Sequence, residues 1–164
     1  MKLWKNMSIF ILCMVASMVF AAAAAPTDVP LDSTAFPDPA FLQWSQQKDT
    51  DGDGFLSQSE LDTVTSMDLR KRGIQDLTGL EHFHALQSLN CSENDLTTLT
   101  LQNFPSLTSL TCNENPKLTT LDLSGAPALQ HLYCFHSNLS QLDLRDLPIQ
   151  KHQVQLPGMP LQPL

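Results

Sequence analysis

The chain has 164 residues, of which 42% are hydrophobic and 16% charged, and its formal net charge is −8. This acidic composition argues against a nucleic-acid partner, because affinity for a phosphate backbone comes from lysine and arginine. The length suits one domain with an ordinary hydrophobic core, preceded by a targeting segment.

The first 25 residues are predicted to be a secretory signal peptide. Lys2 and Lys5 give a positive start, residues 7–20 are apolar, and residues 21–25 are alanines typical of a cleavage site. An uncleaved membrane anchor is the alternative, but the weakly hydrophobic alanine-rich end favours cleavage. Loss of the two lysines changes the formal net charge from −8 to −10. We therefore expect a secreted or periplasmic protein with no membrane span after cleavage.

Residues 26–37 contain prolines and acids without a hydrophobic period, so we predict a flexible leader there. A small helical cap is predicted over residues 38–65. It begins at Asp38, which is followed by a proline in the manner of a helix start. Phe41 and Trp44 then lie three residues apart, on one face of a short helix.

Residues 49–60 match the EF-hand calcium loop over its whole length. Alternating aspartates direct carboxylates to one centre, a glycine at the sixth position permits a sharp turn, a backbone carbonyl follows, and a glutamate closes the ring. Ca²⁺ is a hard cation that takes about six to eight oxygen ligands of this kind. The alternative is an acidic surface turn that binds no cation. The predicted ligands are Asp49, Asp51, Asp53, Phe55, Ser57 and Glu60.

Residues 64–148 are dominated by a repeated pattern. Leu86, Leu107 and Leu129 each begin a copy of L-x-x-L-x-C, with spacings of 21 and 22 residues, which lie in the range of leucine-rich repeats. A degenerate copy beginning at Val64 brings the number to about four. Threonines in the second half of each copy favour extended chain rather than helix.

The predicted fold is a mainly β leucine-rich repeat solenoid of short parallel strands, with a helix–calcium loop–helix cap at its N-terminal end. Such a cap is needed because a terminal repeat would otherwise expose its core. Residues 149–164 are predicted to hold a closing strand near Val154 and a proline-rich tail that stops further pairing.

Polar residues and cysteines recur at fixed places in the copies. Asn94 and Asn115 are expected to turn their amides inward and to hydrogen-bond backbone groups in the bend. Cys91, Cys112 and Cys134 share one inward position. Export favours disulfides, but parallel Cβ directions in stacked strands hinder bridging, so we prefer buried free thiols.

The chain resembles bacterial secreted leucine-rich repeat proteins. The resemblance is carried by Phe36-Pro37-Asp38, the loop 49–60 with Leu61, Gly79-Leu80-Glu81 and the three copies, and it covers about residues 36–145. It implies a calcium-braced solenoid that interacts with proteins or surfaces.

The outward residues of the concave strands are the expected contact surface, because exposed aromatic side chains on a rigid face are common anchors. The alternative is that these rings cover the C-terminal end of the solenoid against the tail. The candidate partner-binding residues are Asn90, Thr111, His131, Tyr133 and Phe135.

These features predict a monomeric, non-catalytic module that binds a protein or cell-surface ligand and carries Ca²⁺ as its cofactor. A structural subunit of a larger envelope assembly is the alternative. The sequence has no nucleophile elbow, zinc motif or phosphate loop, so we expect no enzyme activity. The pair His131 and His136 and the pair His82 and His84 lack an accompanying ligand motif, and Arg70-Lys71-Arg72 is expected to be a solvated turn.

Overall fold

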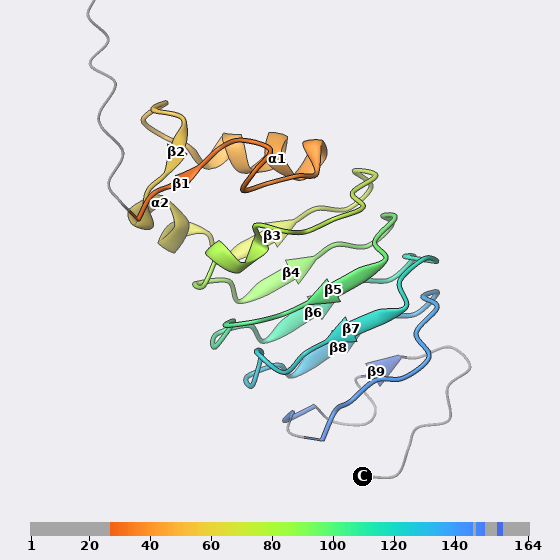
Figure 1. Cartoon of the computed structure of the whole chain (residues 1–164). Helices are drawn as coiled ribbons and strands as arrows, with labels where there is room; N and C mark the ends of the chain where they lie inside the picture. Colours follow the sequence, from red (N-terminus) through yellow and green to blue (C-terminus); the bar gives the residue numbers. More distant parts are fainter. Residues whose placement is uncertain (1–26, 146, 150–153, 156–164) are drawn as a thin grey trace, which may run out of the picture.

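The structure, a computed structural model, describes residues 27–145, 147–149 and 154–155. Within these residues the main sheet has five short parallel strands in the order β3-β4-β6-β8-β9 (Figure 1). Leu89 lies opposite Met67 on one side and Leu110 on the other, and Leu110 lies opposite Leu132. The chain thus advances by one repeat from each strand to the next. The strands are β3 (Ser66–Asp68), β4 (Ser88–Asn90), β6 (Ser109–Thr111), β8 (His131–Tyr133) and β9 (Val154–Gln155).

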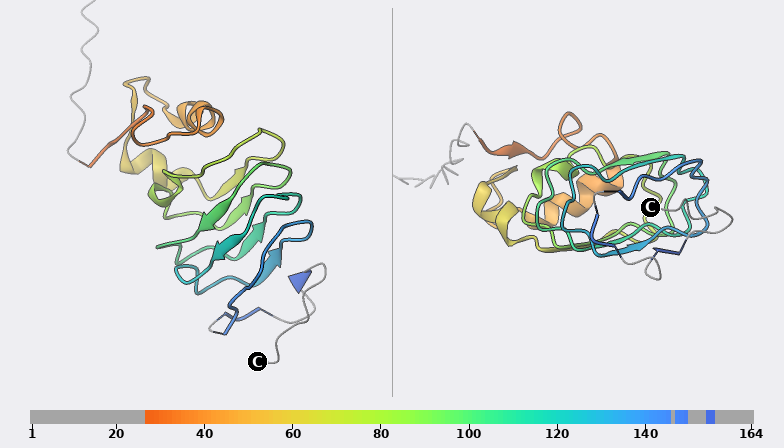
Figure 2. Two further views of the ribbon diagram at one scale, coloured as in Figure 1. Left: turned by 45° about the vertical axis from the view of Figure 1, so that its right-hand side comes forward. Right: turned by 90° about the horizontal axis from the view of Figure 1, so that it is seen from below.

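A second parallel sheet lies on the opposite side of the turns. It pairs β5 (Thr98–Thr100) with β7 (Thr120–Asp122), and Leu99 lies opposite Leu121. Seen from below in Figure 2, the turns stack behind one another as a flattened coil. The threonine-rich half of the repeat is therefore extended, as predicted.

Leucine side chains from the two sheets meet between them and form the core. Leu89, Leu110 and Leu132 come from the main sheet and Leu99 and Leu121 from the other, and all are buried. Burial of one such side chain contributes about 1.5–3 kcal/mol, so the rows of leucines are what hold neighbouring turns together. The chain is a parallel β-solenoid of about three turns, which confirms the predicted solenoid architecture.

Buried asparagines support the bends after β4 and β6. The Asn115 amide nitrogen donates to the carbonyls of Cys91, Cys112 and Asn113 at 3.0–3.2 Å, and its oxygen accepts from the Leu96 amide. Asn94 makes the equivalent set one repeat earlier. The predicted role of both asparagines is confirmed.

The N-terminal part of the chain lies at one end of the solenoid (Figure 1). Two short helices flank the loop at residues 49–60, and a two-stranded antiparallel sheet lies beside it. A further short helix, η2 (Leu80–His82), lies in the first repeat. The elements of this cap are β1 (Val29–Pro30), α1 (Pro39–Ser45), η1 (Gln46–Lys48), β2 (Phe55–Leu56) and α2 (Gln58–Thr63).

The prediction that residues 26–37 form a flexible leader is wrong for the described part of that segment. Val29 is buried in the antiparallel pair with β2, and Phe36 is fully buried. The physical reason is aromatic packing: the Phe36 ring lies 5.4 Å from Phe41 and 6.4 Å from Phe83, measured between ring centroids. The packed structure begins near residue 29 rather than at Asp38.

The predicted closing strand near Val154 is present as β9, which pairs in parallel with β8. The predicted signal peptide and most of the proline-rich tail lie outside the described residues. Among the residues described, none of the helices has the length and apolar character needed to cross a membrane.

Candidate functional site

The calcium-type loop connects η1 to β2 and brings three carboxylates together. Each of Asp49, Asp51 and Asp53 offers one oxygen, and these oxygens all lie within 4.8 Å of one another. Backbone amides hold the arrangement, since Gly52 and Gly54 donate to the two oxygens of Asp49 at 2.6 and 3.0 Å. Both glycines have positive φ angles, which the tight turn requires and glycine adopts without strain.

Glu60 lies in the first turn of α2 and is already hydrogen-bonded. Its Oε1 accepts from the amide and hydroxyl of Thr50 at 2.6 and 2.7 Å, and its Oε2 accepts from the amide and hydroxyl of Ser57 at 3.0 and 2.8 Å. Desolvation raises the pKa of Glu60, but these hydrogen bonds outweigh it and lower that pKa to about 2. The carboxylate therefore stays ionised beside three others.

Mutual repulsion in the loop is visible at Asp51. The amide of Asp53 lowers the pKa of Asp51, but desolvation and the charges of Asp53, Glu60 and Asp49 raise it, and the net shift is upward. A cation at the centre would relieve this repulsion. The loop therefore carries an excess of negative charge that its own hydrogen bonds do not neutralise.

The predicted ligands fit Ca²⁺ in chemistry and partly in placement. All of the donors are oxygen atoms, as a hard cation requires. Three of the six predicted residues, the aspartates, share one centre, and Phe55 follows in β2 with its carbonyl in the loop backbone. Ser57 is instead the N-cap of α2, and the Glu60 carboxylate is not part of the aspartate group. To serve as a ligand, Glu60 would have to exchange hydrogen bonds from Thr50 and Ser57 for the metal.

A feature that the sequence reasoning missed braces this loop. β1 pairs with β2 so that Val29 lies opposite Leu56 and Pro30 opposite Phe55, and the Leu31 amide donates to the Gly54 carbonyl at 3.0 Å. The leader thus supplies a brace for the loop. An available signal was the apolar alternation of Val29 and Leu31 next to the Phe-Pro-Asp segment.

One buried carboxylate joins the cap to the solenoid. Asp38 Oδ1 accepts from the amides of Ala40 and Phe41 at the start of α1. Its Oδ2 accepts from the amides of Gln75 at 2.8 Å and Asp76 at 3.4 Å, in the first repeat. Asp38, the predicted N-cap residue of the first helix, therefore also joins the N-terminal domain cap to the first repeat.

The outward residues of β3, β4, β6 and β8 form the second candidate region, which we call the concave face. Strand register aligns Asn90 with Thr111 and Thr111 with Tyr133. His131 lies in the adjacent row, and the Phe135 amide donates to the Asn113 side chain at 3.1 Å. All five predicted contact residues lie on this one face and are partly exposed.

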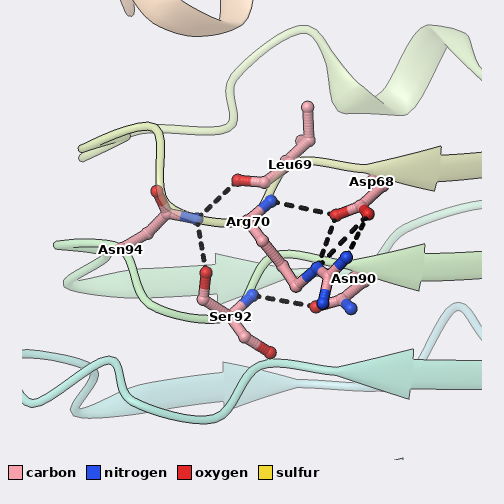
Figure 3. Close-up of polar contacts among 6 residues, drawn as sticks. All are labelled: Asp68, Leu69, Arg70, Asn90, Ser92 and Asn94. Carbon is pink, nitrogen blue, oxygen red and sulfur yellow. Dashed lines mark hydrogen bonds and ion pairs between the residues drawn. The ribbon is translucent and has the colours of Figure 1, made fainter.

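Charged residues gather at the N-terminal end of this face. The Arg70 guanidinium binds both oxygens of Asp68 at 2.8–3.2 Å, and this hydrogen bonding lowers the pKa of Asp68 (Figure 3). Lys71 forms an ion pair with Glu93 at 3.0 Å. These four residues and Arg72 line an open pocket of about 420 Å³. Arg70 and Lys71 are paired with Asp68 and Glu93, so three cations against two anions leave this turn a formal charge of +1.

The cysteine row lies inside the solenoid. Cys91, Cys112 and Cys134 are buried and unbridged in the structure. Burial raises the pKa of Cys91 to about 12, and a hydrogen bond with Cys134 together with burial raises the pKa of Cys112. The hydrogen bond from Cys112 lowers the pKa of Cys134, although burial opposes the shift. All three side chains are buried free thiols, as the preferred interpretation predicts.

Comparison with known proteins supports the fold. Neither a protein-family model nor a curated protein sequence matches the chain. Among solved structures, internalin C2 from Listeria monocytogenes superposes with a TM-score of 0.53 at 19% identity, over 82% of this chain and 70% of the other. This likeness shows the fold class, a leucine-rich repeat solenoid.

Two further internalins of Listeria monocytogenes are similar. InlF matches at 20% identity and a TM-score of 0.43, over 82% of this chain and 55% of InlF. The functional domain of InlJ, described as including a cysteine ladder, matches at 24% identity and a TM-score of 0.41, over 74% of this chain and 36% of that domain.

Proposed function

We propose that this protein is a non-catalytic, secreted interaction scaffold that is stabilised by Ca²⁺ and binds a protein or cell-surface partner through the concave face. The observation that carries the proposal is the concave face itself. It presents Asn90, Thr111 and Tyr133 in one row, held in register by the sheet, with Phe135 beside it. A regular surface of this kind loses little conformational entropy on binding.

The aromatic end is the proposed anchor. Tyr133 and Phe135 are partly exposed, and the Phe135 ring contacts the His136 ring edge-on at 5.6 Å. Large rings that are held in place give much contact area for few rotatable bonds. Removal of both rings should therefore weaken binding more than any other pair of changes on the face.

Ca²⁺ is proposed to act on the cap and not on the partner. Asp49, Asp51 and Asp53 would hold the ion together with the Phe55 carbonyl. The positive charge of the ion would relieve the repulsion among these aspartates and Glu60. The loop is hydrogen-bonded to the leader strand, and the leader packs against α1. Occupancy of the loop therefore stabilises the end of the solenoid at a distance from the concave face.

The non-catalytic part of the proposal rests on the sequence, which has no nucleophile elbow, zinc motif or phosphate loop. A structural subunit of a larger envelope assembly remains the second candidate, and native mass measurement of the purified protein separates a monomer from an assembly.

The test is a pulldown from the native envelope with Tyr133→Ala/Phe135→Ala, compared with the unaltered chain. Thr98→Ala/Thr120→Ala on the opposite sheet is the matched control, since both threonines are exposed. We expect the aromatic variant to lose the captured partner and the control to keep it, both in the presence of Ca²⁺. Equal capture by the two variants would show that the concave face is not the binding surface.

A further inference from the structure

The middle of the concave face carries no strong charge, although the chain is acidic. The outward residues of β4, β6 and β8 include no Asp, Glu, Lys or Arg. We call this region, with the residues that follow each strand, the neutral patch. Its members are partly exposed: Ser88, Asn90, Ser109, Thr111, Asn113, His131, Tyr133 and Phe135. Ser92, between them, is buried.

Two amides of the neutral patch are held in fixed orientation. The oxygen of Asn90 accepts from the Ser92 amide at 3.2 Å (Figure 3), and the oxygen of Asn113 accepts from the Phe135 amide at 3.1 Å. In the described part of the chain, the side-chain nitrogen of each makes no hydrogen bond. Each NH₂ group is therefore a donor whose direction is set before any ligand arrives.

Hydroxyl groups surround these amides and are also available. The side chains of Ser88, Ser109, Thr111 and Tyr133 have no hydrogen-bond partner among the described residues, and all four are partly exposed. A hydroxyl both donates and accepts, so it pairs readily with another hydroxyl. The patch thus offers paired donors and acceptors next to aromatic rings.

From this chemistry we propose that the neutral patch binds a neutral polysaccharide; the inference rests on the proposed function and names its partner. Sugar hydroxyls would bond the amides of Asn90 and Asn113 and the hydroxyl of Thr111, while the apolar face of a sugar ring would lie on Tyr133 or Phe135. The outward residues of these strands include no Lys or Arg that would hold an anionic polymer, and Glu93 and Glu114 in the turns beside the patch are paired with Lys71 and His136.

A protein partner fits this patch less well. Serine is depleted in protein–protein interfaces, and serine and threonine are under-represented among the residues that dominate their affinity. The patch presents no aliphatic side chain as an anchor. Its apolar area is confined to the two rings at the C-terminal end, whereas its polar groups extend over three strands.

The experiment uses native gels that contain a soluble β-glucan, a galactomannan or a mannan, with polygalacturonate as the anionic comparison. The protein is the chain without residues 1–25, in Ca²⁺. We expect at least one neutral polymer to retard it and polygalacturonate not to do so. Tyr133→Ala should weaken the retardation about tenfold, the upper range for loss of one aromatic contact, while Tyr133→Phe keeps most of it.

Asn90→Asp is the sharper variant, because a carboxylate oxygen keeps the bond from Ser92 while the donor is replaced by a negative charge. It should abolish the retardation, and Thr98→Val on β5 should not change it; unchanged melting temperatures show that each variant folds. Retardation by polygalacturonate alone, or by none of the polymers, overturns the proposal. If a protein is captured through Tyr133 while no polysaccharide binds, the proposed function stands and this inference fails; if nothing binds through the face, both fail.

Discussion

Replacement of Phe36 by alanine tests whether the leader is part of the folded cap. The Phe36 side chain is fully buried, and its ring lies 5.4 Å from Phe41, 6.1 Å from His82 and 6.4 Å from Phe83. Removal of a buried phenylalanine ring leaves a cavity and costs about 3–5 kcal/mol. Because the total stability of a domain is about 5–15 kcal/mol, the change should be large and easily measured.

Urea unfolding followed by tryptophan fluorescence provides the assay. Trp44 is the one tryptophan outside the predicted signal peptide, and its ring lies 5.8 Å from Phe83, next to the Phe36 cluster. The free energy of unfolding should fall by about 3–5 kcal/mol, with the melting temperature lowered by roughly 10 °C. The m-value, which is the slope of the unfolding free energy against urea concentration, should stay unchanged if the whole chain still unfolds in one transition.

Phe135→Ala is the matched control, because it removes the same ring from a partly exposed position on the concave face. It should cost about 1 kcal/mol or less. If Phe36→Ala and Phe135→Ala lower the free energy of unfolding equally, the leader contributes no packing, and the flexible-leader interpretation is restored.

Four further predictions follow from the cap, the bends and the core. Chelation of Ca²⁺ should lower the melting temperature, and Asp49→Ala combined with Glu60→Ala should abolish that difference; a melt that is insensitive to chelator would exclude the metal. The pKa of Glu60 is lowered from 4.5 to about 2, so its contribution is present above pH 4.5 and lost as the pH falls toward 2. Glu60→Gln should remove this part of the acid dependence, as equilibrium unfolding at several pH values will show. Asn115→Ala should destabilise the fold by about 3 kcal/mol or more, because it leaves several buried backbone groups without partners. Asn115→Ser should lower the free energy of unfolding by less in urea unfolding, since Ser137 occupies that position one repeat later and bonds the Cys134 carbonyl. In the chain without residues 1–25, which has three of the four cysteines, thiol titration should find three reactive groups after unfolding without reductant and almost none before. A count of one would reveal a disulfide.

Repetition in the sequence is what made the solenoid predictable. The same leucine pattern occurs in each copy at a nearly constant spacing, so a residue that departs from the pattern in one copy does not obscure the assignment. The same redundancy identified the role of Asn94 and Asn115, because the bend after the strand recurs with them. Extended chain on the back of the turns followed from the threonines, whose branched side chains suit a strand.

The cap was less predictable, because its contacts are made once and between distant segments. The loop pattern brings the three aspartates together, but nothing local indicates that Glu60 bonds Thr50, ten residues earlier. Oδ2 of Asp38 accepts a hydrogen bond from the Gln75 amide, which is 37 residues away in the sequence. Proline and acid content suggested disorder for the leader, and tertiary packing of Phe36 overrode that local signal.

The carboxylate of Asp38 has a consequence for how this architecture can be divided. Its two oxygens bind amides of α1 and amides of the first repeat, so a cut between residues 64 and 66, where the repeats begin in the sequence, would separate groups that depend on one another. Whole repeats after β4, by contrast, meet through equivalent leucines and can be added or removed with complementary surfaces left on both sides. The N-terminal cap and the first repeat therefore form one folding unit, whereas the sequence unit that recurs is the single repeat. Extra repeats should accordingly be inserted on the C-terminal side of β4.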